Sequence, residues 1–207
     1  MDDVVELELV VEAPAGWVAI NLDEDFDARE YALAVHRFLA EDLELAGEIV
    51  DRAAVDAAAA PLAAVTRWAR DLIRDRGGVA FAHVGHPEDP TPVWLDVLAR
   101  PEDDFTAWAE ERFGVGIPGV DPRADVREVV LPAGPALRVR SVVVPREGES
   151  PVTEGVDVLV RPDGVPGRVV LSSTWIALAH GNQLATLVDE FAGTVRVRVV
   201  PPGEHRE

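Results

Sequence analysis

The stretch 168–199 constrains the fold more than any other part of the sequence. Residues 169–175 are mostly apolar and β-branched, which favours a strand. Apolar residues then recur at helical spacing up to Phe191, and Gly193 follows as a helix end. Residues 194–199 alternate Val with Thr and Arg, the pattern of a half-buried strand. The stretch therefore predicts strand, helix and strand, with these side chains buried: Trp175, Leu184, Leu187, Val188 and Phe191.

The remaining strand patterns predict an antiparallel sheet. They lie at residues 4–11, 17–22, 79–84, 93–99, 126–131, 136–144 and 155–160, separated by turns rich in Gly and Pro. Because hairpins link most of these strands, we expect an α+β fold with a single, largely antiparallel twisted sheet flanked by helices. No internal repeat and no clear boundary interrupts the chain. We therefore expect one domain over residues 1–200 and a C-terminal tail over 201–207.

Three helical segments precede the last one. The acids at 23–27 lack the spacing of a calcium-binding loop and indicate the start of a helix over 27–40. The apolar stripe of that helix is expected to be buried, and it consists of Tyr31, Val35, Phe38 and Leu39. Residues 43–76 are rich in Ala and strongly favour helix, and Pro61 predicts a kink or a break there. Residues 101–113 predict a further short helix.

The composition excludes several classes of function. The chain has no Cys, which rules out disulfides, thiolate zinc sites and cysteine nucleophiles. Its formal net charge is −19 at pH 7, and residues 1–50 carry 14 Asp and Glu against two Arg. Because such a surface repels phosphate backbones and anionic lipids, we expect no nucleic-acid partner. No run reaches the roughly 20 apolar residues that span a bilayer, and no signal peptide is recognisable. We expect a cytoplasmic protein without membrane insertion.

Two sets of residues are candidates for a binding site. His83, His86, Glu88 and Asp89 lie close together in the sequence and are of the types that bind divalent metals. On a strand, however, the two histidines would point to opposite faces unless Gly85 turned the chain. The simpler interpretation is one histidine at a strand end and one in a loop. The second set is Trp94 and Trp108, which could rim a groove or pack in the core.

Motifs for catalysis or nucleotide binding are weak. Ser172, Ser173, His180 and Asp189 supply the letters of a hydrolase triad, but no G-x-S-x-G turn surrounds either serine. The glycines at 114–119 follow a predicted helix rather than a strand, and Pro118 and Pro122 disfavour a helix after them, so the context of a dinucleotide-binding loop is missing. We therefore expect no catalytic residue and no cofactor.

Several segments resemble a group of uncharacterised actinobacterial proteins with a fold like that of the Mog1/PsbP family. The matching segments are PAGWV at 14–18 with LDED at 22–25, the Ala-rich block ending at Gly78, GPALRV at 134–139, VLSSTW at 170–175, LVDEF at 187–191 and TVRV at 194–197. The resemblance covers residues 10–198, although the Ala-rich block is longer than the plain fold needs. All 19 basic residues are Arg, a bias that also indicates a high-GC bacterium.

The resemblance implies a binding or assembly module, since proteins of that fold group are known chiefly in such roles. It brings no catalytic residues. We therefore expect a non-catalytic protein that interacts with another protein. The alternative is a binder of a small molecule or a divalent metal near His83 and His86, and a hydrolase is the third hypothesis.

Overall fold

The computed structural model of the chain describes residues 6–23, 25–73, 78–89, 93–100, 124–144, 151–163 and 167–200. The chain divides into two compact units. The helical unit is Ala13–Asp96, and the sheet unit combines Met1–Glu12 with Val97–Glu207. One domain over 1–200 stays a prediction. The predicted helix at 101–113 and the predicted tail at 201–207 lie outside the described residues.

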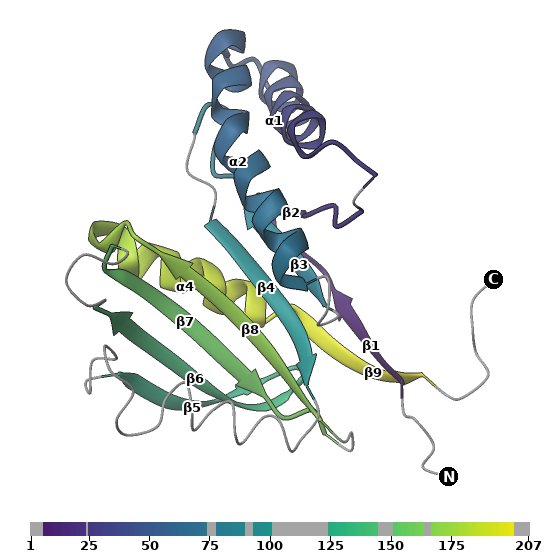
Figure 1. The fold of residues 1–207 in the computed structure, drawn as a ribbon, viewed down its shortest axis with the longest axis vertical. Coiled ribbons are helices and arrows are strands. Elements are labelled where there is room, and N and C mark those ends of the chain that lie inside the picture. Colours follow the sequence, from purple (N-terminus) through teal and green to yellow (C-terminus); the bar gives the residue numbers. More distant parts are fainter. Residues whose placement is uncertain are drawn as a thin grey trace. The chain divides into compact units, whose positions relative to one another are not determined.

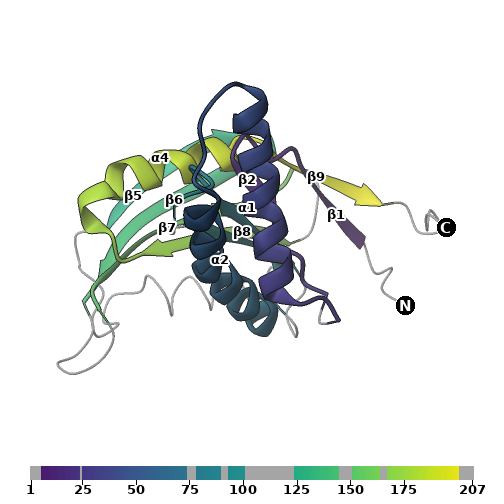
Figure 2. The same ribbon diagram turned by 90° about the horizontal axis from the view of Figure 1, so that it is seen from above.

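The helical unit contains two long helices and short strands. Its elements are β2 (Trp17–Ala19), α1 (Ala28–Leu45), α2 (Arg52–Ile73), β3 (Val79–His83) and the first half of β4 (Val93–Arg100), a strand that continues into the sheet unit. In the strand order, β3 lies between β2 and β4. β2 and β3 are antiparallel, and their register sets Trp17 opposite His83. Figures 1 and 2 show α1 and α2 packed side by side.

The acids before α1 start the helix, as predicted. The carboxylate of Asp27 accepts hydrogen bonds from the backbone N–H groups of Glu30 and Arg29, at 3.0 and 2.7 Å. These bonds favour the charged form and lower the pKa of Asp27 below its usual range. The helix ends at Leu45, more than one turn beyond the predicted end.

The face of α1 that packs on α2 is not the predicted one. The buried residues of α1 recur at every fourth position, and they are Ala28, Ala32, His36 and Ala40. The stripe expected to be buried is open instead: Tyr31, Val35 and Leu39 are half-buried and Phe38 is 62% exposed. At about 100° per residue, the two stripes lie about a quarter of a turn apart on the helix. The prediction was wrong because α2 also presents mainly small side chains, and two small faces let helices approach closely.

α2 passes through Pro61 without a break. It is one helix from Arg52 to Ile73, although proline has no N–H to donate to the preceding turn. The alanines on both sides of Pro61 have the highest helix propensity of all residues and favour continuation. Asp51 caps the first turn, since its carboxylate accepts a hydrogen bond from the backbone N–H of Ala53 at 2.9 Å.

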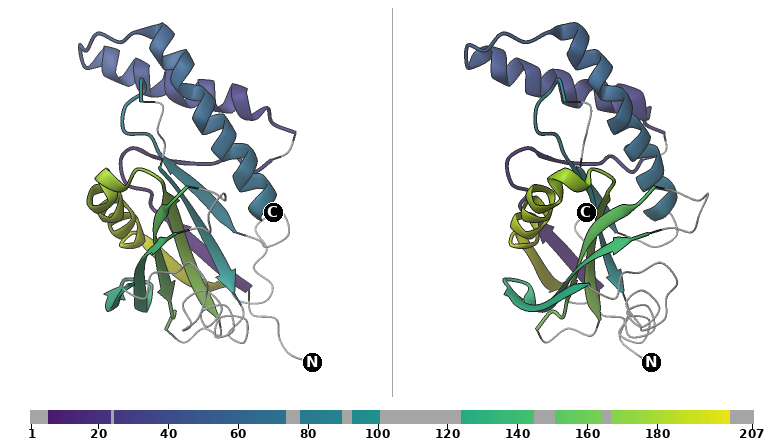
Figure 3. Two further views of the ribbon diagram at one scale, coloured as in Figure 1. Left: turned by 60° about the vertical axis from the view of Figure 1, so that its left-hand side comes forward. Right: turned by 90° about the vertical axis from the view of Figure 1, so that its left-hand side faces the viewer.

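The sheet unit is an antiparallel sheet with one helix on it. Its elements are β1 (Glu6–Val11), the second half of β4, β5 (Asp125–Leu131), β6 (Gly134–Val143), β7 (Thr153–Val160), β8 (Arg168–Trp175), the short 3₁₀ helix η1 (Leu178–His180), α4 (Gly181–Ala192) and β9 (Val195–Val200). The strand order is β4-β8-β7-β6-β5, and β5 to β8 pair antiparallel throughout. Figures 1 and 3 show α4 across one face, on β7 and β8. The predicted α+β class with a largely antiparallel sheet is confirmed.

β1 and β9 form a separate two-stranded antiparallel sheet. The register sets Glu8 opposite Arg198 and Val10 opposite Arg196. Among the described residues, no helix is long and apolar enough to cross a membrane.

The strand, helix and strand predicted over 168–199 are present as β8, α4 and β9. Trp175, Val188 and Phe191 are buried as expected, and Phe191 is fully so. Leu184 and Leu187 are only half-buried. The residues of α4 that face the sheet include Ala185 and Ala192, so small side chains again occupy part of the packed face.

A buried carboxylate connects α4 to the sheet. Glu154 on β7 accepts a hydrogen bond from Arg140 Nε at 2.6 Å and from Trp175 Nε1 at 3.1 Å. The carboxylate also reaches the first residue of α4, where a Cβ on Gly181 would overlap Glu154 Oε2. The positive end of the α4 dipole therefore lies at this carboxylate, which stabilises its charge.

This contact predicts that Gly181→Ala destabilises the protein by about 1–3 kcal/mol, the usual cost of forcing a methyl group into a packed site. Helix propensity alone predicts the opposite, a gain of about 1 kcal/mol. Gly85→Ala is the matched control, because its added Cβ would meet only ordinary contacts, with His83 Cε1 at 3.8 Å. Urea unfolding of both variants distinguishes the two expectations, and a stabilised Gly181→Ala protein would rule out the carboxylate contact.

Candidate functional site

An open groove of about 430 Å³ lies in the helical unit, between α1 and the segment formed by β2 and the loop after it. Its lining is mostly apolar and consists of Gly16, Trp17, Val18, Asn21, Phe26, Tyr31, Ala34, Val35, Phe38 and Leu39. Apart from Ala34, the α1 residues of this lining form the stripe that the sequence predicts to be buried. The stripe lines a groove because the alanine face of the helix packs on α2.

Two aromatic side chains stand at the groove with much of their surface in solvent. Phe38 is 62% exposed and Phe26 is 48% exposed. Single exposed apolar residues are common on proteins, but two phenylalanines lining one apolar groove form a patch suited to binding. The sequence indicates Phe38 only as a core residue, and Phe26 stands out only by its place among acids.

The loop at 21–26 is held in place by α2. Arg70 donates hydrogen bonds from Nε to the carbonyl oxygen of Asn21 at 3.0 Å and from Nη1 to that of Phe26 at 2.8 Å. Within the loop, the backbone N–H of Asp23 donates to Asn21 Oδ1 at 2.8 Å, and that of Asp25 donates to Asp23 Oδ1 at 3.0 Å. Phe26 is therefore presented by a loop that is fixed at both ends.

Acidic residues flank the groove at both ends. Asp23 and Asp25 lie on the loop beside Phe26, and neither takes part in an ion pair within the described part of the chain. Glu41 and Asp42 are exposed on the turn of α1 that follows Phe38. By helical periodicity they continue the face of the apolar stripe. The groove therefore combines an apolar floor with a negative rim.

Tyr31 is the main polar group on the α1 side of the groove. Its hydroxyl donates a hydrogen bond to the carbonyl oxygen of Ala19 at 2.5 Å. Burial disfavours the charged phenolate and raises the pKa of Tyr31 to about 12. Since the phenolate could not donate this bond, the neutral form links α1 to the end of β2.

Three of the four candidate metal ligands, His83, His86 and Glu88, take part in other contacts. The ring of His83 packs edge-on against Trp17, with centroids 5.4 Å apart. A Cβ on Gly16, which has a φ of +83°, would lie 2.8 Å from His83 Nε2. The histidine is thus covered by a tight glycine turn. Among the described residues, no group of three or more His, Asp or Glu side chains could hold a metal ion.

The loop that follows β3 supports the two helices. Glu88 Oε1 accepts a hydrogen bond from the backbone N–H of Asp51 at 2.7 Å, just before α2. His86 Nδ1 accepts one from the backbone N–H of Glu88 at 3.3 Å. The carbonyl oxygen of Pro87 lies 2.7 Å from Nδ1 of the fully buried His36 on α1. These contacts give the loop, including Glu88, a structural role.

The remaining candidates also have structural neighbours. Trp94 packs its ring on Trp68 of α2, with centroids 4.2 Å apart. Trp108 lies outside the described residues, so its pairing with Trp94 at a groove stays a prediction.

The residues that could compose a hydrolase triad have different structural surroundings. Ser172 donates a hydrogen bond to Asp157 Oδ1 at 2.6 Å, and Ser173 is fully buried. Asp189 accepts one from Arg138 Nε at 2.6 Å. His180 is exposed at the end of η1. The contacts of Ser172 and Asp189 are thus separate, and the groove lining includes none of the four residues.

The raised pKa of Tyr31 can be measured directly, because Tyr31 is the only tyrosine in the chain. We expect tyrosinate absorbance to appear with a midpoint at about pH 12 in the folded protein and near pH 10 in denaturant. Because the folded pKa is the higher one, its contribution to stability is present below pH 10 and lost as the pH rises to about 12. A folded-state midpoint near 10 would show that Tyr31 is solvated.

Comparison with known proteins leaves the family open. No family model matches the chain, and no curated protein matches it. A solved structure with some likeness is that of LpqN, described as involved in cell envelope biogenesis of Mycobacterium tuberculosis. The likeness has a TM-score of 0.40 and 10% sequence identity, over 97% of this chain and 87% of that one. A likeness this distant assigns no activity or partner, and the Mog1/PsbP-like fold stays a prediction.

Proposed function

We propose that this protein is a non-catalytic binding module that holds a basic segment of another protein in the groove of its helical unit. The observation that supports the proposal is the open apolar stripe of α1, in which Phe38 is 62% exposed beside Phe26. When a partner covers the apolar surface of the groove, burial stabilises the complex by about 25 cal/mol for each Å² buried.

The chemistry of the rim selects the partner. Asp23 and Asp25 precede Phe26 in the chain, Glu41 and Asp42 follow Phe38 by one turn of α1, and the chain as a whole has a formal net charge of −19. A segment with Lys or Arg beside its apolar residues is attracted by this rim, whereas an acidic segment is repelled. Charges on the rim contribute mainly to the association rate and to specificity, while the buried apolar contacts hold the complex together.

The length of the groove limits the segment that fits. From Tyr31 to Leu39 the helix axis rises by about 12 Å. An extended chain covers that distance with about four residues, and a helix with about two turns. The groove therefore suits a short linear segment with one or two apolar anchors flanked by basic residues.

The lining favours binding over chemistry. Asn21 supplies an amide and Tyr31 a hydroxyl already bonded to the main chain, and the other described lining residues are Gly16 and side chains that are apolar or aromatic. Nucleophilic catalysis needs a nucleophile held beside a base, and acid–base catalysis needs a titratable group held beside a second polar group. The described lining of the groove provides neither arrangement.

A synthetic peptide of alternating Leu and Lys, with a fluorescent label, tests the proposal by anisotropy. We expect saturable binding that Phe38→Ser weakens at least tenfold, or about 1.4 kcal/mol, and that Ile49→Ser leaves unchanged. Ile49 is fully exposed at the turn between the helices and is absent from the groove lining, so it controls for loss of surface apolarity.

A second peptide in which Glu replaces every Lys tests the rim. We expect it to bind at least tenfold more weakly, with the difference decreasing as salt screens the charges. Equal affinity of the wild-type protein and Phe38→Ser for the Lys peptide would show that attraction to the acidic surface alone holds the peptide. That outcome would exclude the groove as the binding site.

A further inference from the structure

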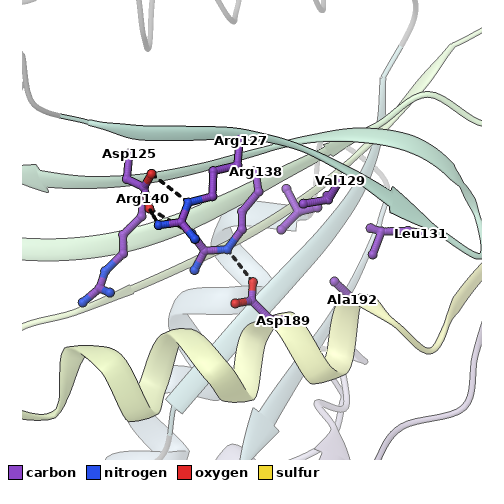
Figure 4. A pocket seen from close by; sticks show the side chains of 9 residues that line it. Asp125, Arg127, Val129, Leu131, Arg138, Arg140, Asp189 and Ala192 are labelled. Atoms are coloured by element: carbon purple, nitrogen blue, oxygen red, sulfur yellow. Dashed lines mark hydrogen bonds and ion pairs between the residues drawn. The ribbon is translucent and has the colours of Figure 1, made fainter.

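A second cavity, of about 320 Å³, lies in the sheet unit between α4 and the hairpin of β5 and β6 (Figure 4). The register of the hairpin sets Asp125 opposite Arg140 and Arg127 opposite Arg138. The cavity is polar at the end where these four residues lie. Its lining is Asp125, Arg127, Val129, Leu131, Arg138, Arg140, Val158, Asp189 and Ala192.

Arg127 and Arg138 are like charges at directly facing positions, an arrangement that destabilises a strand pair unless anions balance it. Asp125 bonds Arg127 at 2.8–2.9 Å, and Asp189 of α4 bonds Arg138 Nε at 2.6 Å. The bond from Arg127 and the nearby charges of Arg138 and Arg140 hold the pKa of Asp125 below its usual range. Asp125 therefore remains charged, and the bonds to Asp125 and Asp189 fix the two guanidinium groups.

The guanidinium groups keep donors for a further acceptor. Within the described part of the chain, Arg127 uses Nε and Nη2 toward Asp125, and Arg138 uses Nε toward Asp189. Nη1 of Arg127 and Nη2 of Arg138 have no partner among the described residues. Arg140 is occupied, since it binds Glu154 and donates to Asn182 Oδ1 at 2.8 Å. Two facing guanidinium groups thus offer terminal N–H groups in the polar half of the cavity.

The other half of the cavity is apolar. Val129 and Leu131 continue β5 beyond the arginines, and Ala192 faces them from the last turn of α4, as Figure 4 shows. Along β5, the distance from Arg127 to Leu131 is about 13 Å. A ligand with a charged head at the arginines and an apolar tail of several carbons matches this division.

The charges around the cavity limit the head group. Asp125 and Asp189 balance Arg127 and Arg138, and Glu154 balances Arg140, so a head group with one negative charge is favoured over a dianion. A carboxylate carries a single negative charge and fits the planar N–H groups of a guanidinium. A phosphate dianion would place its second charge close to Asp125 and Asp189. We infer that this cavity binds a small amphiphilic carboxylate, with the head on Arg127 and Arg138 and the aliphatic tail against Val129, Leu131 and Ala192.

Octanoate is the probe, used with the full chain below the concentration at which it aggregates. Calorimetry should show saturable binding of octanoate, with at least tenfold weaker binding of acetate, which lacks the tail, and of octan-1-ol, which lacks the charge. Arg127→Gln should weaken octanoate binding at least tenfold. Arg127 is largely exposed, so this variant is expected to fold. Weaker binding of both comparators would support the site, and binding of octan-1-ol equal to that of octanoate would overturn the inference.

Two substitutions on neighbouring positions of β5 locate the ligand. Val129→Asp places a negative charge in the apolar half and should abolish octanoate binding, whereas Val130→Asp lies on the opposite face, at a residue that is 87% exposed, and should not change it. Thermal melting shows whether each variant is folded. If Val129→Asp is not folded, the binding of octanoate by Arg127→Gln alone tests the inference. Equal binding by wild type and Arg127→Gln contradicts the inference. This site is independent of the proposed function, so Phe38→Ser should bind octanoate normally.

Discussion

The packing of two alanine faces determines what the helical unit can present to a partner. α1 contributes Ala28, Ala32 and Ala40, and α2 contributes a matching set that includes Ala59 and Ala63. Small side chains let two helices approach closely, and each such helix then has another face free for larger residues. On α1 that other face carries Phe38 and lines a groove. The open groove is therefore a consequence of how the two helices pack.

Polar contacts secure this arrangement at its margins. Arg37 of α1 forms a bidentate pair with Asp56 of α2, at 2.8 and 2.9 Å. Such exposed pairs contribute little stability, but they restrict how one helix slides on the other. Arg70 connects α2 to the loop that carries Phe26, so both helices contribute to the position of the groove residues. The groove is thus defined by packing and positioned by directed hydrogen bonds.

The sequence predicts where helices and strands lie better than it predicts which face of each helix is buried. Strand, helix and strand over 168–199 follow from periodicity, and the helix start at Asp27 follows from capping chemistry. Periodicity predicts that the stripe of Phe38 is in the core, because burying a large apolar side chain stabilises a fold more than burying alanine does. Which stripe packs depends on the partner helix, and that information is not local. For the same reason, a helix pattern could not indicate that Phe26 and Phe38 would line one groove.

The cavity in the sheet unit depends on register, which the sequence left open. The sequence predicted a turn at residues 132–135, but Pro135 pairs with Val130 and the hairpin loop is only Pro132 and Ala133. Gly134 makes this possible, with a φ of +136° and a position where a Cβ would overlap the carbonyl of Arg161. A shift of one residue would move Arg127 to the other face of β5. The facing arginines could therefore be recognised only once the pairing was known.

The central claim is that α1 presents an uncovered apolar stripe that a basic segment binds. Hydroxyl-radical footprinting with mass spectrometry measures the solvent exposure of individual side chains, and the fully buried Phe191 serves as internal reference. We predict that Phe38 is oxidised much faster than Phe191 in the free protein, and that the Leu–Lys peptide protects Phe38. Oxidation of Phe38 as slow as that of Phe191 in the free protein would show that the stripe is covered, and would contradict the account.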